Sequence, residues 1–195
     1  MANVNAPFGF NPLCRIDGAV WNAQTRPEAI DPASATAIYK GDPVSWNSSG
    51  YLERMTAGTG QIAGVFWGCS YTPAAPGIIP YSDYWPGSGN FSATSPITAY
   101  VIEDPMVIFE AQAGGTAIAL TSRNLNVQFN LGTAGVRGVG LSGAYVESPA
   151  VTATLPFRIV GFREAPGNGS DIASAYNIVQ VVMNNMTLKN TTGVA

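Results

Sequence analysis

The sequence has no histidine, and only 11% of its 195 residues are charged. An ordinary soluble domain has about 25% charged residues. Histidine is the side chain that most often acts as a general acid, general base or metal ligand near neutral pH, and imidazole-dependent catalytic triads require it. Its absence argues against catalysis, so we expect neither enzymatic activity nor a cofactor or bound metal.

Basic residues are also scarce. The chain has nine lysines and arginines in total, they form no cluster, and the formal net charge is -3. Binding to a nucleic-acid backbone needs several cations that converge on phosphates, so we expect no nucleic-acid partner. No apolar run approaches the roughly 20 residues that span a bilayer, so no membrane partner is expected either. The first residues lack the charged and apolar regions of a secretory signal, which predicts synthesis in the cytoplasm.

The sequence has only two cysteines, Cys14 and Cys69, and neither lies in a CxxC pair. They therefore cannot build a zinc knuckle or a redox dithiol within this chain. Two buried free thiols are the preferred interpretation. Pairing between the two cysteines in an oxidising compartment stays open.

Glycine (22 residues) and proline (14 residues) are spread along the whole chain. They divide it into short segments rich in Val, Ile, Thr, Tyr and Phe, which is typical of many short strands. The sequence therefore predicts an all-β fold, a β-barrel or β-sandwich of short antiparallel strands with an extended N-terminal arm. The predicted strands are Thr36–Lys40, Val44–Trp46, Tyr51–Met55, Gln61–Tyr71, Ile97–Glu103, Met106–Gln112, Leu125–Leu131, Phe157–Phe162 and Asn177–Met183.

Residues 1–35 differ from the rest because four prolines interrupt them and their apolar residues are irregularly spaced. We interpret them as the extended arm, which either packs on its own domain or, as we prefer, adds to the sheet of a neighbouring subunit. Residues 36–189 form the β-rich domain, with a division into two small subdomains near 71–96 as an option, and 190–195 form a flexible C-terminus. The arm contributes the candidate interface residues Phe8, Phe10, Leu13 and Trp21.

Residues 71–87 form the densest aromatic loop in the chain. Tyr81, Tyr84 and Trp85 are its candidate binding residues. Three interpretations stay open: the rings cover the core, they anchor a contact between subunits, or they stack on sugars.

Several segments resemble a known family. Lys40-Gly41-Asp42-Pro43-Val44, a turn to Tyr51-Leu52 and then Gln61-Ile62-Ala63-Gly64-Val65-Phe66 resemble the small β-barrel signature of head decoration (cement) proteins of tailed bacteriophages. Residues 103–112, 157–162 and 177–185 resemble phage structural proteins of similar length. The resemblance implies a non-enzymatic virion component, often a trimer, that binds the outside of the capsid lattice and braces it.

From these observations we expect a structural virion protein on the capsid exterior, with the major capsid protein and further copies of itself, as a homotrimer, as its partners. Interface cores are depleted of charge, which fits the composition. The alternative is a receptor- or carbohydrate-binding β module of a virion fibre or adhesin that uses Tyr81, Tyr84 and Trp85. A histidine-independent hydrolase with a carboxylate pair is a third, weaker hypothesis.

Overall fold

The computed structural model describes residues 3–56, 58–73, 79–90, 96–133, 140–163 and 171–189. Within these ranges the chain forms β-strands and short 3-10 turns, with no α-helix, so the predicted all-β class is confirmed. The 3-10 turns are η1 (Ser88–Asn90), η2 (Leu120–Ser122) and η3 (Thr187–Lys189). The strands are β1 (Asn11–Arg15), β2 (Arg26–Ala29), β3 (Ile38–Tyr39), β4 (Pro43–Trp46), β5 (Leu52–Arg54), β6 (Gly64–Tyr71), β7 (Ile79–Ser82), β8 (Tyr84–Trp85), β9 (Thr98–Ile102), β10 (Val107–Gln112), β11 (Asn126–Asn130), β12 (Tyr145–Ala150), β13 (Phe157–Phe162) and β14 (Ile178–Met183).

Every predicted strand is confirmed, with ends that differ by a few residues. The structure adds β1 and β2 in the N-terminal arm, β7 and β8 in the aromatic loop, and β12. Most of these additional strands contain or adjoin a proline, which removes a backbone donor and lowers the strand signal in the sequence. Pairing with neighbouring strands outweighs that local weakness.

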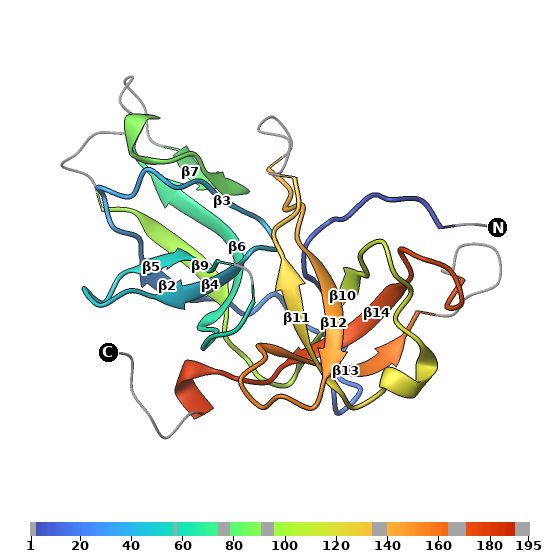
Figure 1. Cartoon of the computed structure of the whole chain (residues 1–195). Helices are drawn as coiled ribbons and strands as arrows, with labels where there is room; N and C mark the ends of the chain where they lie inside the picture. Colours follow the sequence, from blue (N-terminus) through green and yellow to red (C-terminus); the bar gives the residue numbers. More distant parts are fainter. Residues whose placement is uncertain are drawn as a thin grey trace.

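The described strands form two main antiparallel sheets, which lie side by side in Figure 1. The C-terminal sheet has the order β1-β10-β14-β13-β11-β12. The N-terminal sheet has the order β2-β9-β6-β4-β5, with β7 beside β6, and β3 pairs with β8 next to it. The sheets pack as a sandwich-like fold and do not close into a barrel.

A shared core holds the sheets together. Strand β14 alternates between buried and partly exposed positions, as expected for a sheet with one face in the core. The cluster that contains Phe109, Phe129 and Phe157 of the C-terminal sheet also includes Val65 and Ile102 of the N-terminal sheet. A second cluster, around Phe66 and Trp85, fills the N-terminal sheet itself.

A buried polar junction joins the sheets at Asp42, which is fully buried. Its carboxylate accepts hydrogen bonds from the Ser142 hydroxyl at 2.5 Å and the Tyr39 amide at 2.9 Å, and it pairs with Arg54 Nε at 2.8 Å. Burial raises the pKa of Asp42, while the Arg54 guanidinium acts in the opposite direction. Next to it, Gly41 adopts a φ of +90° and its carbonyl accepts the Phe10 amide, a conformation and approach that favour glycine.

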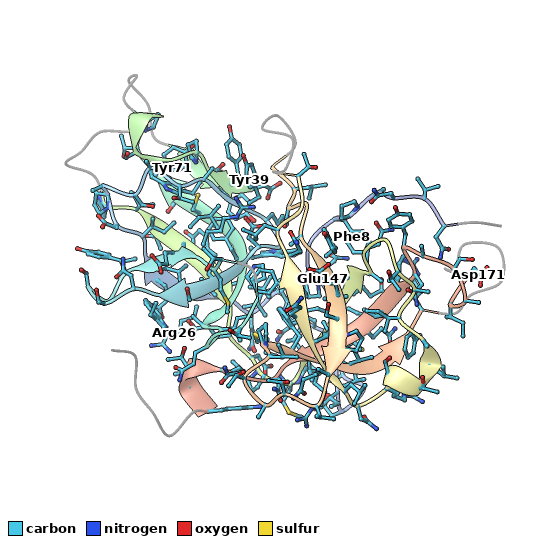
Figure 2. The ribbon with its side chains drawn as sticks, viewed as in Figure 1. Phe8, Arg26, Tyr39, Tyr71, Glu147 and Asp171 are labelled. Atoms are coloured by element: carbon cyan, nitrogen blue, oxygen red, sulfur yellow. The ribbon has the colours of Figure 1, made fainter. Side chains whose placement is uncertain are left out.

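The N-terminal arm is extended, but it packs on its own chain, so the preferred intersubunit placement is wrong. Strand β1 pairs with β10, and β2 pairs with β9. Phe10 is fully buried and stacks on Phe157 with ring centroids 4.0 Å apart. Figure 2 shows Phe8 beside the C-terminal sheet. The Phe10 ring is thus covered by the chain's own core, whereas Leu13, Ile16 and Val20 of the same arm stay exposed.

The optional division near 71–96 does not occur, because β6 and β9 on either side of this segment pair in one sheet. The chain instead crosses between the sheets at residues 16–25 and again at 103–106. The predicted flexible C-terminus, 190–195, lies outside the described residues. Cys14 and Cys69 belong to different sheets and are both free, which decides the open question of pairing, but only Cys69 is buried and Cys14 is half-buried.

Replacing Phe10 with alanine should lower the free energy of unfolding by about 3–5 kcal/mol, because it leaves a cavity between Phe129 and Phe157. Urea unfolding followed by tryptophan fluorescence measures the change. Val4→Ala is the control, since Val4 lies in the same arm and is exposed. Equal stability of the two variants would show that the arm is not part of the core.

Candidate docking surface

The candidate interface residues from the sequence have different environments in the structure. Phe10 and Trp85 are fully buried in the hydrophobic clusters, so their prediction as interface residues is wrong. The sequence predicted an interface at both rings because exposing a large aromatic ring to water is unfavourable in free energy. The fold resolves that cost by burying them.

Other candidate rings are half-buried and contact rings of the same chain. Trp21 packs edge-to-face on Trp67, with centroids 5.0 Å apart. Tyr84 stacks on Tyr39 at 6.1 Å. Leu13 and Tyr81 remain as clearly exposed candidates, and they lie on different sheets.

Exposed apolar side chains gather around the turn that follows β1. The exposed fractions are 44% for Leu13, 51% for Ile16, 82% for Val20 and 37% for Met106. The chain reverses here, since Cys14 bridges to Val20, and the Ile16 amide donates to the Met106 carbonyl at 2.7 Å. We call residues 13–20 together with Met106 the apolar hairpin.

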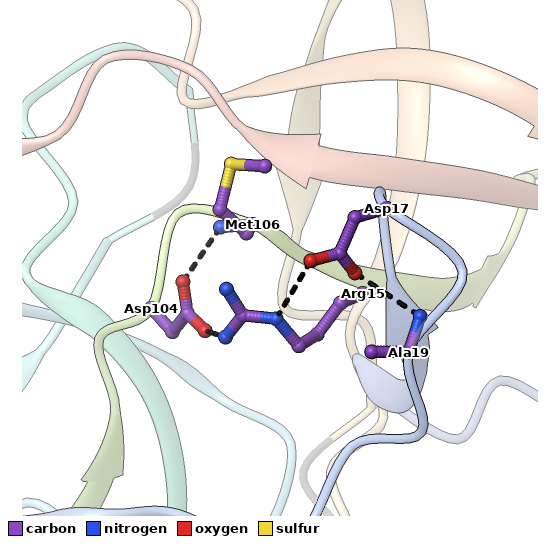
Figure 3. A network of polar contacts seen from close by, with 5 residues as sticks. All are labelled: Arg15, Asp17, Ala19, Asp104 and Met106. Carbon is purple, nitrogen blue, oxygen red and sulfur yellow. Dashed lines mark hydrogen bonds and ion pairs between the residues drawn. The ribbon is translucent and has the colours of Figure 1, made fainter.

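Figure 3 shows how charged side chains fix the apolar hairpin. The Arg15 guanidinium contacts the Asp104 carboxylate and lies 3.6 Å from that of Asp17. Asp104 also accepts the Met106 amide at 2.9 Å, and Asp17 accepts the Ala19 amide at 3.1 Å. The charges of this network are therefore paired within the chain, and Arg15 and Asp17 remain partly exposed beside the apolar side chains of the hairpin.

A second arginine acts in the same way on the other sheet. Arg26 of β2 pairs with Glu28 at 2.8 Å and with Glu103 at 3.2 Å. Arg15 and Arg26 thus hold adjacent residues, Asp104 and Glu103, of the 103–106 connection. Two arginine ion pairs therefore tie the N-terminal segment to this crossing between the sheets.

Sequence reasoning identified Leu13 but missed Ile16, Val20 and Met106. A signal was present, because Asp17-Gly18 between apolar residues is a strong hairpin pattern. In the structure the chain turns here, and the Gly18 amide donates a hydrogen bond to the Arg15 carbonyl at 2.9 Å. The contact with Met106 is not visible from sequence, because it joins segments about 90 residues apart.

The residues that the structure describes contain no group of three or more Asp, Glu, Cys or His side chains that could hold a metal ion. Among the same residues, no helix has the length and apolar character needed to cross a membrane. Comparisons with protein-family models, with curated proteins and with solved structures give no match.

Burial raises the pKa of Glu103, the neighbouring Glu28 acts in the same direction, and Arg26 opposes both. Because the pKa of Glu103 is higher in the folded state, its protonated form stabilises the fold. This contribution to the free energy of unfolding is lost as Glu103 ionises, when the pH rises above about 4.5. Glu103→Gln should avoid that loss. The difference in free energy of unfolding between variant and wild type should therefore shift in favour of the variant between pH 4 and 7.

Urea unfolding at several pH values measures this difference. Glu53→Gln is the control, since Glu53 is exposed and lies on β5. A difference between Glu103→Gln and wild type that stays constant with pH would contradict the assignment.

Proposed function

We propose that this chain is a structural protein of a tailed-bacteriophage particle that binds the outer surface of the capsid and stabilises it. The single observation that carries the proposal is the apolar hairpin, an exposed apolar surface whose supporting charges are already paired inside the chain. The proposed partners are the major capsid protein and further copies of this chain.

The chemistry of the hairpin favours a protein partner. Cores of protein interfaces are depleted of charged residues, and apolar side chains there are excluded from water on binding. Leu13, Ile16 and Val20 can be buried without breaking the Arg15 ion pairs, which lie in the supporting network. Binding at this surface does not require the desolvation of an isolated charge.

The segment that carries the resemblance to decoration proteins also supports the proposal. Residues 40–66 fold into the antiparallel strands β4, β5 and the start of β6, as a small β-unit requires. A trimer of such units would engage several lattice sites at once. The resulting effective concentration would make modest individual contacts long-lived.

Quantitative mass spectrometry of purified particles tests the proposal directly. We expect a copy number comparable to that of the major capsid protein, and light scattering of the isolated protein should give the mass of a trimer. Absence from the particles, or only a few copies in each, would reject the lattice role. A monomeric mass would reject the trimer alone.

The double substitution Ile16→Ser and Val20→Ser should weaken binding to particles that lack the protein by at least about tenfold. Full burial of each apolar side chain contributes about 1.5–3 kcal/mol, and about 1.4 kcal/mol corresponds to a tenfold change in affinity. Sedimentation of bound protein with the particles measures the affinity. Val151→Ser is the matched control, because Val151 is equally exposed (86%) but lies outside the hairpin. Equal affinities of the two variants would exclude the hairpin as the docking surface.

A further inference from the structure

A cavity of about 240 Å³ lies in the C-terminal sheet, between strand β12 and the loop that follows β10. Residues 114–118 form one wall and residues 147–149 form the other. Pockets for drug-sized ligands have volumes of about 300–1,000 Å³. This cavity is smaller, so it suits a group of about the size of one amino-acid side chain.

The cavity begins where the pairing between its two walls ends. Ala113 forms an isolated parallel bridge with Val146, and the Gly114 amide donates to the Val146 carbonyl at 3.0 Å. The Gly114 carbonyl then accepts the Tyr176 amide at 3.2 Å, so it does not continue the ladder with β12. The loop and the strand separate at this point.

A β-bulge shapes the wall that β12 contributes. Asn126 of β11 pairs with Ala150 and Gln128 pairs with Glu147, so two residues of β12 lie opposite one residue of β11. One of these two, Ser148, has a φ of +53°, which is uncommon for a residue other than glycine. A bulge bends its strand, and here the bend lies at the cavity.

Glu147 is the only charged residue among the described residues that line the cavity. None of the described lysines and arginines forms an ion pair with it. Its Oε1 accepts a hydrogen bond from Asn130 Nδ2 at 3.4 Å, and no described residue donates to its Oε2. A Cβ atom at position 114 would lie 3.8 Å from Oε2, so this oxygen faces the opposite wall at Gly114.

The negative charge of Glu147 also acts on its neighbour. Burial raises the pKa of Tyr145, and the Glu147 carboxylate acts in the same direction. No described cation offsets this effect. The cavity therefore has a carboxylate whose charge is available to a ligand.

The rest of the lining offers acceptors and aliphatic surface. Thr116 and Ser148 contribute hydroxyl groups, which can accept hydrogen bonds beside the carboxylate. Ala117, Ile118 and Pro149 contribute aliphatic side chains, which can cover an apolar chain.

We infer that this cavity, which we call the Glu147 cavity, binds an alkylammonium group. The ammonium donates to the Glu147 carboxylate and the neighbouring hydroxyls, and the methylene groups pack on the aliphatic side chains of the lining. Hydrogen bonds between an ammonium and a carboxylate are charge-assisted and about twice as strong as neutral ones. A lysine side chain of a protein partner and a free aliphatic amine such as a polyamine present this same chemistry.

An inorganic cation fits the cavity less well. Calcium takes six to eight oxygen ligands, usually from several carboxylates, and magnesium requires a tight octahedral set. The described residues contain no group of three or more acidic, cysteine or histidine side chains, and the aliphatic part of the lining cannot ligate a metal. A neutral ligand would leave the carboxylate without a counter-charge.

The test is NMR titration of the full chain, labelled with nitrogen-15, at constant ionic strength. The ligands are n-butylammonium, Nα-acetyl-lysine methylamide and spermidine. We expect saturable shifts of the amide signals of 114–118 and 147–148. n-Butanol, which has the same alkyl chain without the charge, should give no saturable shift.

Glu147→Gln should weaken amine binding by about tenfold or more, because it removes the charge and keeps the shape. Glu53→Gln is the matched control, since this exposed glutamate of β5 undergoes the same change outside the cavity. Amide signals far from the cavity verify that each variant is folded. If Glu147→Gln does not fold, the comparison of n-butylammonium with n-butanol decides the outcome.

Tighter binding of the lysine derivative than of spermidine would assign the cavity to a protein lysine, and the reverse to a free polyamine; either result supports the inference. No saturable shift with any amine, equal binding of n-butanol, or unchanged affinity in Glu147→Gln would overturn it. So would displacement of the amine by calcium at the same ionic strength, because the cavity would then be a metal site.

The Glu147 cavity shares no residue with the apolar hairpin, and the inference does not depend on the proposed capsid role. The Ile16→Ser, Val20→Ser variant should bind amines normally. Loss of particle binding in that variant with amine binding retained separates the two tests.

Discussion

The buried contact between Asp42 and Ser142 joins the sheets, and the rest of the structure depends on that join. The carboxylate is fully buried, and its cost is offset by the Arg54 guanidinium and by hydrogen bonds from Ser142 and the Tyr39 amide. Removing one member of such a group leaves a buried charge without its partner, which is strongly destabilising. The junction therefore specifies one arrangement of the 140–144 segment against the N-terminal sheet.

The apolar hairpin lies where the chain crosses between the two sheets, which this contact and the shared hydrophobic core hold together. With the sheets held together, the N-terminal segment can run from β1 to β2 alongside the 103–106 connection, where Arg15 and Arg26 clamp Asp104 and Glu103. The apolar hairpin projects from that clamp.

Sequence reasoning predicted the strands well and the surfaces poorly. Glycine, proline and β-branched residues act locally, and they were sufficient to place β4, β6, β10 and β14. Burial is not local. Phe10 and Trp85 have the same type of surroundings in sequence as Leu13 and Tyr81, and only the fold separates the buried pair from the exposed pair.

The sequence by itself determined the all-β class, the short strands and the scarcity of charge, because these follow from backbone preferences and composition. Only the tertiary structure decided that the arm packs on its own chain, that Met106 joins the hairpin beside Ile16, and that Gly68 leaves space for the Tyr81 ring. Each of these depends on residues far apart in the chain. Their contacts are set by strand order and register, which local patterns do not encode.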